Sequence, residues 1–236
     1  MEDLSDNERE EQLRNWWSEN WLWIVGGIAL GLAALAGYQY WQQTRYQSAE
    51  AAEASYLSLL DTLERDDRDA AVKQGDELRR AHPKSPYADQ ADLALARAAV
   101  NRRDFDEAAR RLRSVADSSR DTELRGIARS RLARVLVEQG KPDEALALLD
   151  VAQAGAFAAL FHDLRGDALA AKGDAAAAAR EYDAALAATP AMGEAPTAEP
   201  GSTAVVDRTY VELKRDALAV SPAAAPATAP AKVDKP

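Results

Sequence analysis

The side chains in this sequence best suited to bind a ligand are Arg97 and Arg134, which occupy equivalent positions in two similar segments of the chain. A guanidinium group is planar and always charged, and its N–H donors form a fork that matches a carboxylate. Two such groups could clamp a carboxylate or the main-chain carbonyls of an extended polypeptide. The alternative is that each arginine forms an ion pair with a neighbouring acidic residue of its own chain.

Other residue types that carry out chemistry are scarce or isolated. The chain has no cysteine and two histidines, His82 and His162, which lie far apart in the sequence and do not make a zinc site. Asp104, Asp143 and Asp174 each precede a helical pattern, where we expect the carboxylate to accept a backbone N–H as a helix N-cap. The sequence contains no phosphate-binding loop, nucleophilic serine motif or pair of catalytic carboxylates. We therefore expect no enzymatic activity, no cofactor, no metal and no small-molecule substrate.

The charge balance excludes nucleic acid as a partner. The chain carries 29 Lys and Arg against 39 Asp and Glu, a formal net charge of -10, and residues 1–20 are rich in acids. Proteins that bind DNA or RNA carry a basic patch that faces the phosphates, and neither half of this sequence supplies one.

A long uncharged segment near the start of the chain predicts a membrane anchor. No charged residue lies between Glu19 and Arg45, and a helix of about 20 apolar residues crosses a hydrocarbon core about 30 Å thick. We expect an acidic leader over residues 1–20 and a transmembrane helix over residues 21–41. Aromatic rings that prefer the membrane interfaces gather at both ends of the segment: Trp16, Trp17, Trp21 and Trp23 before it, and Tyr38, Tyr40 and Trp41 after it.

Two other interpretations of this segment are a cleaved signal peptide and a buried helix of a soluble protein. The tripeptide Ala34-Leu35-Ala36 fits the small-x-small pattern of a cleavage site. However, the leader is long and acidic, whereas signal peptides begin with a short basic region. The uniform apolarity of the segment, and the placement of its aromatic rings only at the two ends, disfavour a buried helix of a soluble protein.

The flanking charges favour a cytoplasmic N-terminus, because Arg9 and Arg14 precede the segment closely and only Arg45 follows it closely. Within the segment, Gly27 and Gly31 lie one helical turn apart, so that a second transmembrane helix could approach the backbone there. These two glycines are the candidate intramembrane helix contact.

The rest of the chain repeats a pattern of paired helices. The segments LARAAVNRRDFDEAARRL, LARVLVEQGKPDEALALL and LRGDALAAKGDAAAAAREY each contain an apolar helix, a short break and an amphipathic helix. Small residues at Ala108, Ala145 and Ala178 recur at a spacing of about 34 residues, which resembles the tetratricopeptide repeat. The predicted fold is all-α: a single N-terminal transmembrane helix followed by a tetratricopeptide-like, right-handed α-solenoid of helical hairpins.

The remaining boundaries follow from composition. Helix formers continue over residues 42–65, which predicts a helical stalk, and the hairpins occupy residues 66–189. Residues 190–204 are typical of a linker, residues 205–220 of a capping helix and residues 221–236 of a disordered tail rich in Pro and Ala. The residues of the capping helix expected to be buried are Tyr210, Val211, Leu213, Ala217 and Leu218.

In such a solenoid the first helix of each hairpin lines a concave surface, which is the natural place for a protein ligand. The repeat register places the following residues on that surface, as the candidate protein-binding groove: Gln90, Leu93, Arg97, Asn101, Ser130, Arg134, Glu138, Asp163 and Asp167.

The order of these parts is similar to that of the YfgM family of bacterial inner-membrane proteins. The similarity rests on the acidic leader, the tryptophan-flanked anchor and the segments AHPKSPYADQADLALA, ARSRLARVLVEQGKPDEALALLD, LRGDALAAKGD and VELKRDAL. The segment at residues 189–201 and the final tail depart from the family pattern. The resemblance implies a single-pass protein of the bacterial inner membrane with a cytoplasmic N-terminus and a periplasmic repeat domain. It also implies association with the SecYEG translocon and with a periplasmic chaperone such as PpiD.

We therefore expect a membrane-anchored periplasmic module that binds proteins beside the Sec translocon and assists the hand-over or folding of secreted and envelope proteins with periplasmic chaperones. One alternative is a scaffold for another envelope assembly, which would bind a folded partner but no unfolded protein. The other is a regulator of an envelope stress response, which would act through the acidic leader.

Overall fold

The computed structural model describes residues 6–189 and 206–220. The predicted linker at residues 190–204 and the predicted tail at residues 221–236 lie outside the described residues, as does the start of the leader. The described residues form helices and no strand, which confirms the all-α class. The chain divides into two compact units, Met1–Glu53 and Ala54–Pro236.

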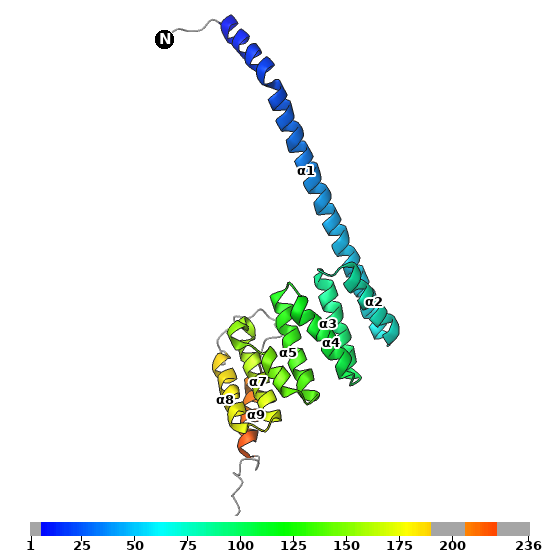
Figure 1. Ribbon diagram of the computed structural model, residues 1–236, viewed down its shortest axis with the longest axis vertical. Helices are drawn as coiled ribbons and strands as arrows, with labels where there is room; N and C mark the ends of the chain where they lie inside the picture. The colour runs from blue at the N-terminus through cyan, green and yellow to red at the C-terminus, as the bar shows by residue number, and fades with distance from the viewer. Residues whose placement is uncertain (1–5, 190–205, 221–236) are drawn as a thin grey trace, which may run out of the picture. The chain divides into compact units, whose positions relative to one another are not determined.

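The first unit holds most of α1 (Asp6–Glu64), the long helix drawn in blue in Figure 1. Among the described residues, Leu13–Glu64 contains a window apolar enough to cross a membrane, with a mean hydropathy of 1.7 and none of it buried. Trp23 and Leu30 expose 83% and 76% of their surface. A continuous apolar surface of this kind is unfavourable in water, and a helix satisfies its backbone hydrogen bonds internally. The helix α1 is therefore suited to a lipid bilayer.

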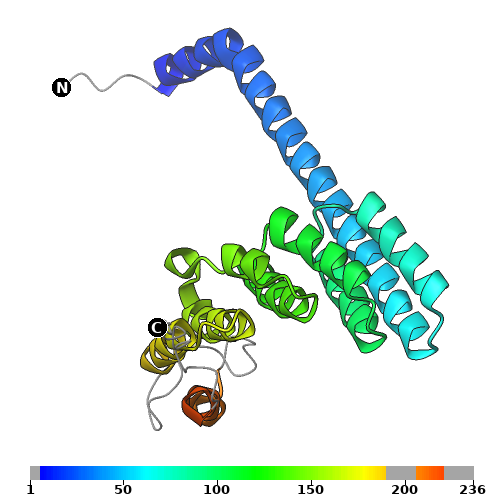
Figure 2. The same cartoon turned by 60° about the horizontal axis from the view of Figure 1, so that its bottom comes forward.

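The second unit is a row of helical hairpins, which Figure 1 and Figure 2 show stacked one on the next. Its helices are α2 (Arg68–Ala81), α3 (Pro86–Asn101), α4 (Phe105–Ser118), α5 (Thr122–Glu138), α6 (Pro142–Leu148), α7 (Ala158–Ala171), α8 (Ala175–Ala188) and α9 (Arg208–Val220). Helix α3 packs on α4, α5 on α6 and α7 on α8, and neighbouring hairpins contact through α4 with α5 and through α5 and α6 with α7. This arrangement confirms the predicted α-solenoid.

Small residues lie where two helices of a hairpin approach closely. Ala108, Ala145 and Ala178 are fully buried. A Cβ atom added to Gly166 of α7 would lie 2.4 Å from the ring of Tyr182 on α8. The absence of a side chain at Gly166 therefore makes room for the tyrosine, which fills the space between the two helices.

The middle hairpin is less regular than its sequence indicates. The repeat alignment makes Ala152 the equivalent of Ala185 on α8 and so places it on the second helix of this hairpin. The structure differs, because α6 ends at Leu148 and two 3-10 turns follow, η1 (Val151–Gln153) and η2 (Gly155–Phe157). The turns carry Phe157 over Gly126, where an added Cβ would lie 2.5 Å from the phenylalanine ring. Gly155 has a φ of +53°, a left-handed conformation that ends helical geometry. The aromatic ring thus replaces the missing turns of α6 in the core.

Two of the three expected aspartate N-caps are confirmed. The carboxylates of Asp104 and Asp174 accept backbone N–H groups in the first turns of α4 and α8. The expectation for Asp143 is wrong, because this residue lies inside the first turn of α6. Pro142 occupies the first position of that helix, and Lys141 is its N-cap without a side-chain hydrogen bond.

A buried ionic network joins α2, α3 and α4. The carboxylate of Asp92, which is 2% exposed, accepts hydrogen bonds from Arg79 at 2.6 Å and 3.0 Å and from Arg111 at 3.1 Å. Arg79 also donates to Asp89, and Arg111 also donates to Glu107. Burial lowers the pKa of Arg79, but the hydrogen bonds and charges of the two aspartates outweigh it and hold the pKa above its ordinary value. The first hairpins are therefore held together by paired charges as well as by apolar contacts.

Candidate protein-binding groove

The predicted groove residues lie on the first helices of three hairpins and differ widely in exposure. On α3, Arg97 and Asn101 are exposed, Gln90 is half-buried and Leu93 is buried; on α5, Arg134 and Glu138 are exposed and Ser130 is buried; on α7, Asp163 is buried and Asp167 is half-buried. Two neighbouring hollows on this surface bring most of the polar groups together. Gln90, Leu93, Asn101 and Ser130 line neither of these two hollows.

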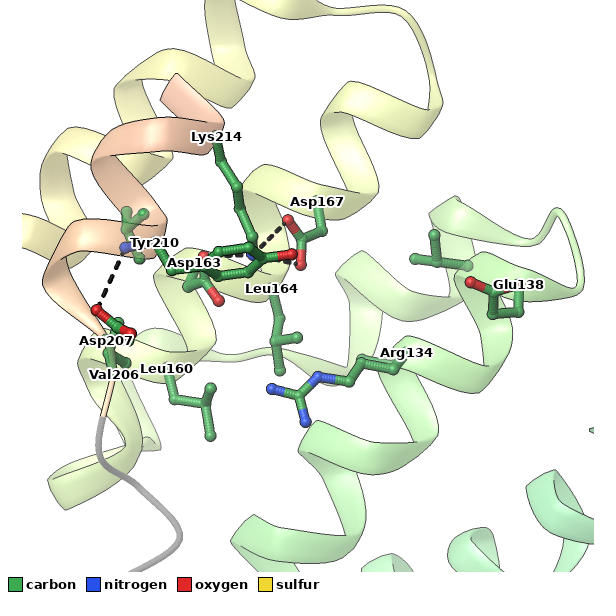
Figure 3. A pocket seen from close by; sticks show the side chains of 13 residues that line it. Arg134, Glu138, Leu160, Asp163, Leu164, Asp167, Val206, Asp207, Tyr210 and Lys214 are labelled. Carbon is green, nitrogen blue, oxygen red and sulfur yellow. Dashed lines mark hydrogen bonds and ion pairs between the residues drawn. The ribbon is translucent and has the colours of Figure 1, made fainter. Parts of the chain in front are cut away.

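The larger hollow, called the α9 hollow here, has a volume of about 600 Å³ and lies between α5, α7 and α9 (Figure 3). Of the predicted groove residues, Arg134, Glu138, Asp163 and Asp167 line it. Helix α9 contributes Tyr210, Val211 and Lys214. The chain's own last helix therefore forms one wall of the predicted groove.

Lys214 ties α9 to the groove face of α7. Its ammonium group donates to Asp163 at 2.8 Å and to Asp167 at 2.9 Å, and it lies 4.8 Å from the centre of the Tyr210 ring. Burial lowers the pKa of Lys214, but the hydrogen bonds to the two aspartates outweigh it and hold the pKa above its ordinary value. Tyr182 completes the arrangement by donating its hydroxyl to Asp167 at 2.8 Å. Asp163 and Asp167 are thus engaged by the chain itself.

The carboxylate of Asp163 depends on this contact, because it is 6% exposed. Burial raises the pKa of Asp163 above its ordinary value, and the negative charge of Asp167 adds to this effect. The hydrogen bond from Lys214 acts in the opposite direction. Removal of the lysine would therefore leave a buried carboxylate without its cation.

The face that α9 turns inward differs from the expected one. Val211 is 1% exposed, as predicted, but Tyr210 and Leu213 are 56% and 65% exposed, and Ala217 is exposed as well. Leu218 is half-buried. The two aspartates on α7 select the rotation of α9 that directs Lys214 toward them, and Leu213 then points away. The apolar pattern of the sequence alone does not predict this rotation of α9.

The smaller hollow, called the arginine hollow here, has a volume of about 320 Å³ and lies between α3, α4 and α5. It is lined by Ala96, Arg97, Val100, Leu112, Arg131, Arg134 and Val135. Arg97 and Arg134 thus lie at one hollow, as the repeat register predicts, and Arg134 also lines the α9 hollow.

Arg131 is a third cation at this place, and the sequence reasoning missed it. It precedes Arg134 by almost one turn of α5, and this spacing is the sequence feature that could have placed it at the same surface. Burial lowers the pKa of Arg131 below its ordinary value, and the charges of Arg97 and Arg134 lower it further. Among the residues that the structure describes, no carboxylate forms an ion pair with any of the three arginines. Arg97 and Arg134 therefore form no direct ion pair with a described acid, although the charge of Arg134 lowers the pKa of Asp163.

Gly27 and Gly31 lie on the exposed surface of α1. A Cβ atom added at either glycine would have no neighbour within 4 Å in the described structure. Their backbone is therefore open to a second helix.

The histidines lie apart from both hollows. His162 donates one hydrogen bond at 2.7 Å to the carboxylate of Glu181, which also accepts from Arg165 at 2.9 Å, so this histidine joins α7 to α8. The described residues contain no group of histidine and acidic side chains that could hold a metal ion.

Comparison with known proteins identifies a family model and several relatives that match this chain. A model of the tetratricopeptide repeat-like domain matches residues 14–220. A protein of Escherichia coli strain K12 is 31% identical over 192 residues, which cover 80% of this chain and 92% of the relative. A protein of Haemophilus influenzae strain Rd is 30% identical over 180 residues, or 76% of this chain and 88% of the relative. One from Neisseria gonorrhoeae strain FA 1090 is 26% identical over 184 residues. All three relatives are named ancillary SecYEG translocon subunit.

Proposed function

This chain belongs to the family of the ancillary SecYEG translocon subunits, known as the YfgM family, and on that premise we propose that it is a protein-binding module associated with the Sec translocon. The observation that supports the proposal most strongly is the extent of the match, which covers 92% of the Escherichia coli relative and includes both the anchor and the repeats. Agreement over both parts favours a shared place in the cell as well as a shared fold.

The first part of the proposed function is attachment to a membrane. The apolar window of α1 is not buried at all in the described structure, and exposed tryptophans and tyrosines flank it. These features fit a helix that crosses a bilayer with its aromatic rings at the interfaces. The chain is therefore membrane-anchored, and we propose the bacterial inner membrane as its location.

The second part is protein binding without chemistry. The chain is not an enzyme, because it belongs to a family of ancillary subunits built on a repeat fold that mediates protein contacts. The concave surface formed by α3, α5 and α7 offers two hollows for such contacts, and three arginines without ion-pair partners among the described residues lie at one of them.

The third part concerns orientation and partners. We place the leader in the cytoplasm, since Arg9 and Arg14 precede the anchor, and the repeat domain in the periplasm. There it would meet chains that leave the translocon and would help to hand them to periplasmic chaperones such as PpiD. Anchoring beside the channel raises the local concentration of both partners, so that each contact can be weak and reversible.

The orientation can be tested with single cysteines, because the natural chain contains none. We expect a membrane-impermeant maleimide, added to spheroplasts, to label a Ser118→Cys variant and to leave a Ser5→Cys variant unlabelled until the membrane is lysed. The reverse pattern would place the repeats in the cytoplasm and would overturn the proposal.

The association can be tested by purifying the tagged full chain from membranes in a mild detergent. SecYEG subunits should co-purify with it, and the yield should fall when residues 21–41 are replaced by an unrelated transmembrane helix. Recovery of a different envelope complex without SecYEG would favour a scaffold at another assembly.

A further inference from the structure

We propose that the arginine hollow binds a partner segment in which a carboxylate lies next to an aliphatic side chain. This inference rests on the proposed protein-binding function and names the chemistry of the ligand at one part of the groove. It extends the expectation for Arg97 and Arg134 by a third cation, Arg131, and by an apolar surface beside the charges.

The charges at this hollow form no direct ion pair with the described chain, although Arg134 and Asp163 both line the α9 hollow and the charge of Arg134 lowers the pKa of Asp163. Arg97 and Arg134 are exposed, Arg131 is half-buried, and none of the three forms an ion pair within the described residues. Elsewhere in the same unit, the buried Arg111 pairs with Asp92 and the half-buried Lys214 pairs with Asp163. The arginine hollow therefore differs from the structural ionic contacts of the fold.

Mutual repulsion gives the hollow a reason to bind an anion. Burial depresses the pKa of Arg131, and the positive charges of Arg97 and Arg134, which line the same hollow, depress it further. A carboxylate placed among the three guanidinium groups would relieve that repulsion. It would also accept paired N–H donors from the planar groups, a geometry that favours carboxylates.

An apolar surface beside the cations selects among anions. Ala96, Leu112 and Val135 are buried beneath the hollow, and Val100 exposes 37% of its surface beside Arg97. A volume of about 320 Å³ is at the small end of ligand pockets, so it suits one or two side chains rather than a folded element. A segment with an aliphatic side chain next to an acidic one would bury the first on Val100 and pair the second with the arginines.

The hollow is also continuous with the rest of the groove. Arg134 lines both the arginine hollow and the α9 hollow. Figure 3 shows the Arg134 side chain between α5 and the Asp163 side of α7. A bound segment could therefore extend from α3 toward α7, where Asp163 and Asp167 are already paired with Lys214. The free cationic part of the groove is thus the part left for an acidic ligand.

The test uses the full chain in nanodiscs of zwitterionic phosphatidylcholine and three fluorescent peptides of equal length. The first peptide alternates leucine with glutamate and aspartate. The second replaces every acid by its amide, and the third replaces every leucine by serine. Binding is followed by fluorescence polarisation at two salt concentrations.

We expect the acidic leucine peptide to bind and the other two peptides to bind at least about tenfold more weakly. Arg97→Gln and Arg134→Gln should each weaken the first peptide about tenfold, since each removes charge-assisted hydrogen bonds. The matched control is Arg180→Gln on α8, which removes an exposed arginine that lines neither hollow and should change nothing. Val100→Ser should weaken the leucine peptide and leave the serine peptide unchanged.

Three results would overturn the inference. Equal binding of the acid and amide peptides would remove the role of the carboxylate. Equal binding of the leucine and serine peptides would leave only unspecific charge attraction. Displacement of the peptide by nanodiscs that contain phosphatidylglycerol, with the same dependence on Arg97 and Arg134, would assign the arginines to an anionic lipid.

The failure of this inference is separable from failure of the proposed function. If none of the peptides binds while SecYEG still co-purifies with the chain, the ligand chemistry is wrong and the translocon association stands. If SecYEG does not co-purify but the acidic peptide binds through the arginines, the ligand chemistry stands and the translocon association is wrong.

Discussion

Replacement of Lys214 by methionine tests how α9 is held on the groove. Methionine keeps an unbranched apolar side chain but removes the charge that Asp163 and Asp167 share. The side chains of Lys214 and Asp163 are 16% and 8% exposed, so the pair is largely shielded from solvent. We expect Lys214→Met to release α9 from α7 more often while the preceding hairpins stay folded.

The size of the effect follows from the burial of the pair. Removal of one partner from a buried ion pair costs about 3–5 kcal/mol, because the remaining charge stays desolvated. Asp167 is partly solvated and keeps its hydrogen bond from Tyr182, which places the expected cost at the lower end, about 3 kcal/mol. A loss of that size makes opening of α9 about 100-fold more frequent.

The assay is hydrogen exchange of the full chain in detergent micelles, read by mass spectrometry over Arg208–Val220. The matched control is Lys172→Met, because Lys172 pairs with Asp143 at an exposed site where a salt bridge contributes about 1 kcal/mol or less. Exchange of α9 should accelerate about 100-fold in Lys214→Met and remain unchanged in the control. Unchanged exchange of α9 in Lys214→Met would refute the argument that this ion pair holds the helix.

Protonation gives a second check on the same variant. Burial raises the pKa of Asp163, so the folded state binds a proton at higher pH than the unfolded chain does. The carboxyl therefore favours the folded state more as the pH falls through that raised pKa. In Lys214→Met the docking of α9 should recover on acidification, and Asp163→Asn in the same background should give that recovery at neutral pH.

Three further predictions concern the stability of the solenoid. Asp92→Asn should destabilise the first hairpins by about 3 kcal/mol, seen as a lower urea midpoint, because the buried Arg111 and the half-buried Arg79 share this carboxylate; an unchanged midpoint would contradict the network. Glu181 has its pKa raised by burial but lowered more strongly by hydrogen bonds from α7, so its net pKa lies below the ordinary 4.5. The stability that Glu181 contributes is then complete above its ordinary pKa and is lost as the pH falls through the lower folded pKa. Glu181→Gln should therefore flatten the stability curve below about pH 4.5. Gly166→Ala should lower the thermal midpoint by an amount equivalent to about 1–3 kcal/mol, because its methyl group meets the Tyr182 ring, and Tyr182→Leu in the same chain should restore part of the loss.

The repeat architecture could be predicted because its signals are local and periodic. Ala108, Ala145 and Ala178 recur at nearly equal spacing, and each is fully buried at a helix contact. The uncharged segment before Arg45 is long enough for a bilayer, and it forms part of α1. Length, period and the placement of small residues thus give the class of fold without any knowledge of side-chain contacts.

Features that depend on contacts between distant residues could not be predicted in this way. In the middle hairpin α6 ends at Leu148 and Phe157 packs on Gly126, and no helical pattern within α6 indicates either feature. The rotation of α9 depends on two carboxylates on α7, which lie far from Lys214 in the sequence.

The candidate groove also combines features that the sequence predicts with features that it does not. The repeat register brought Arg97 and Arg134 to one hollow, since equivalent positions face the same side of a solenoid. The repeat register does not predict which groups pair within the chain, so the contact between Lys214 and Asp163 does not follow from it. It also overlooks Arg131, because that position is not repeated on α3, where Ala94 occupies it.

Site-specific photo-crosslinking in living cells tests whether the chain binds proteins beside the translocon through the arginine hollow. A photoreactive residue at position 100 lies in the hollow, and one at position 180 lies on the exposed face of α8 as a matched control. We expect position 100 to capture a SecYEG subunit, a secreted chain or a periplasmic chaperone, identified by mass spectrometry, and position 180 to capture much less. Capture of cytoplasmic proteins at position 100, or equal capture at both positions, would contradict a translocon-bound receptor with this groove as its binding surface.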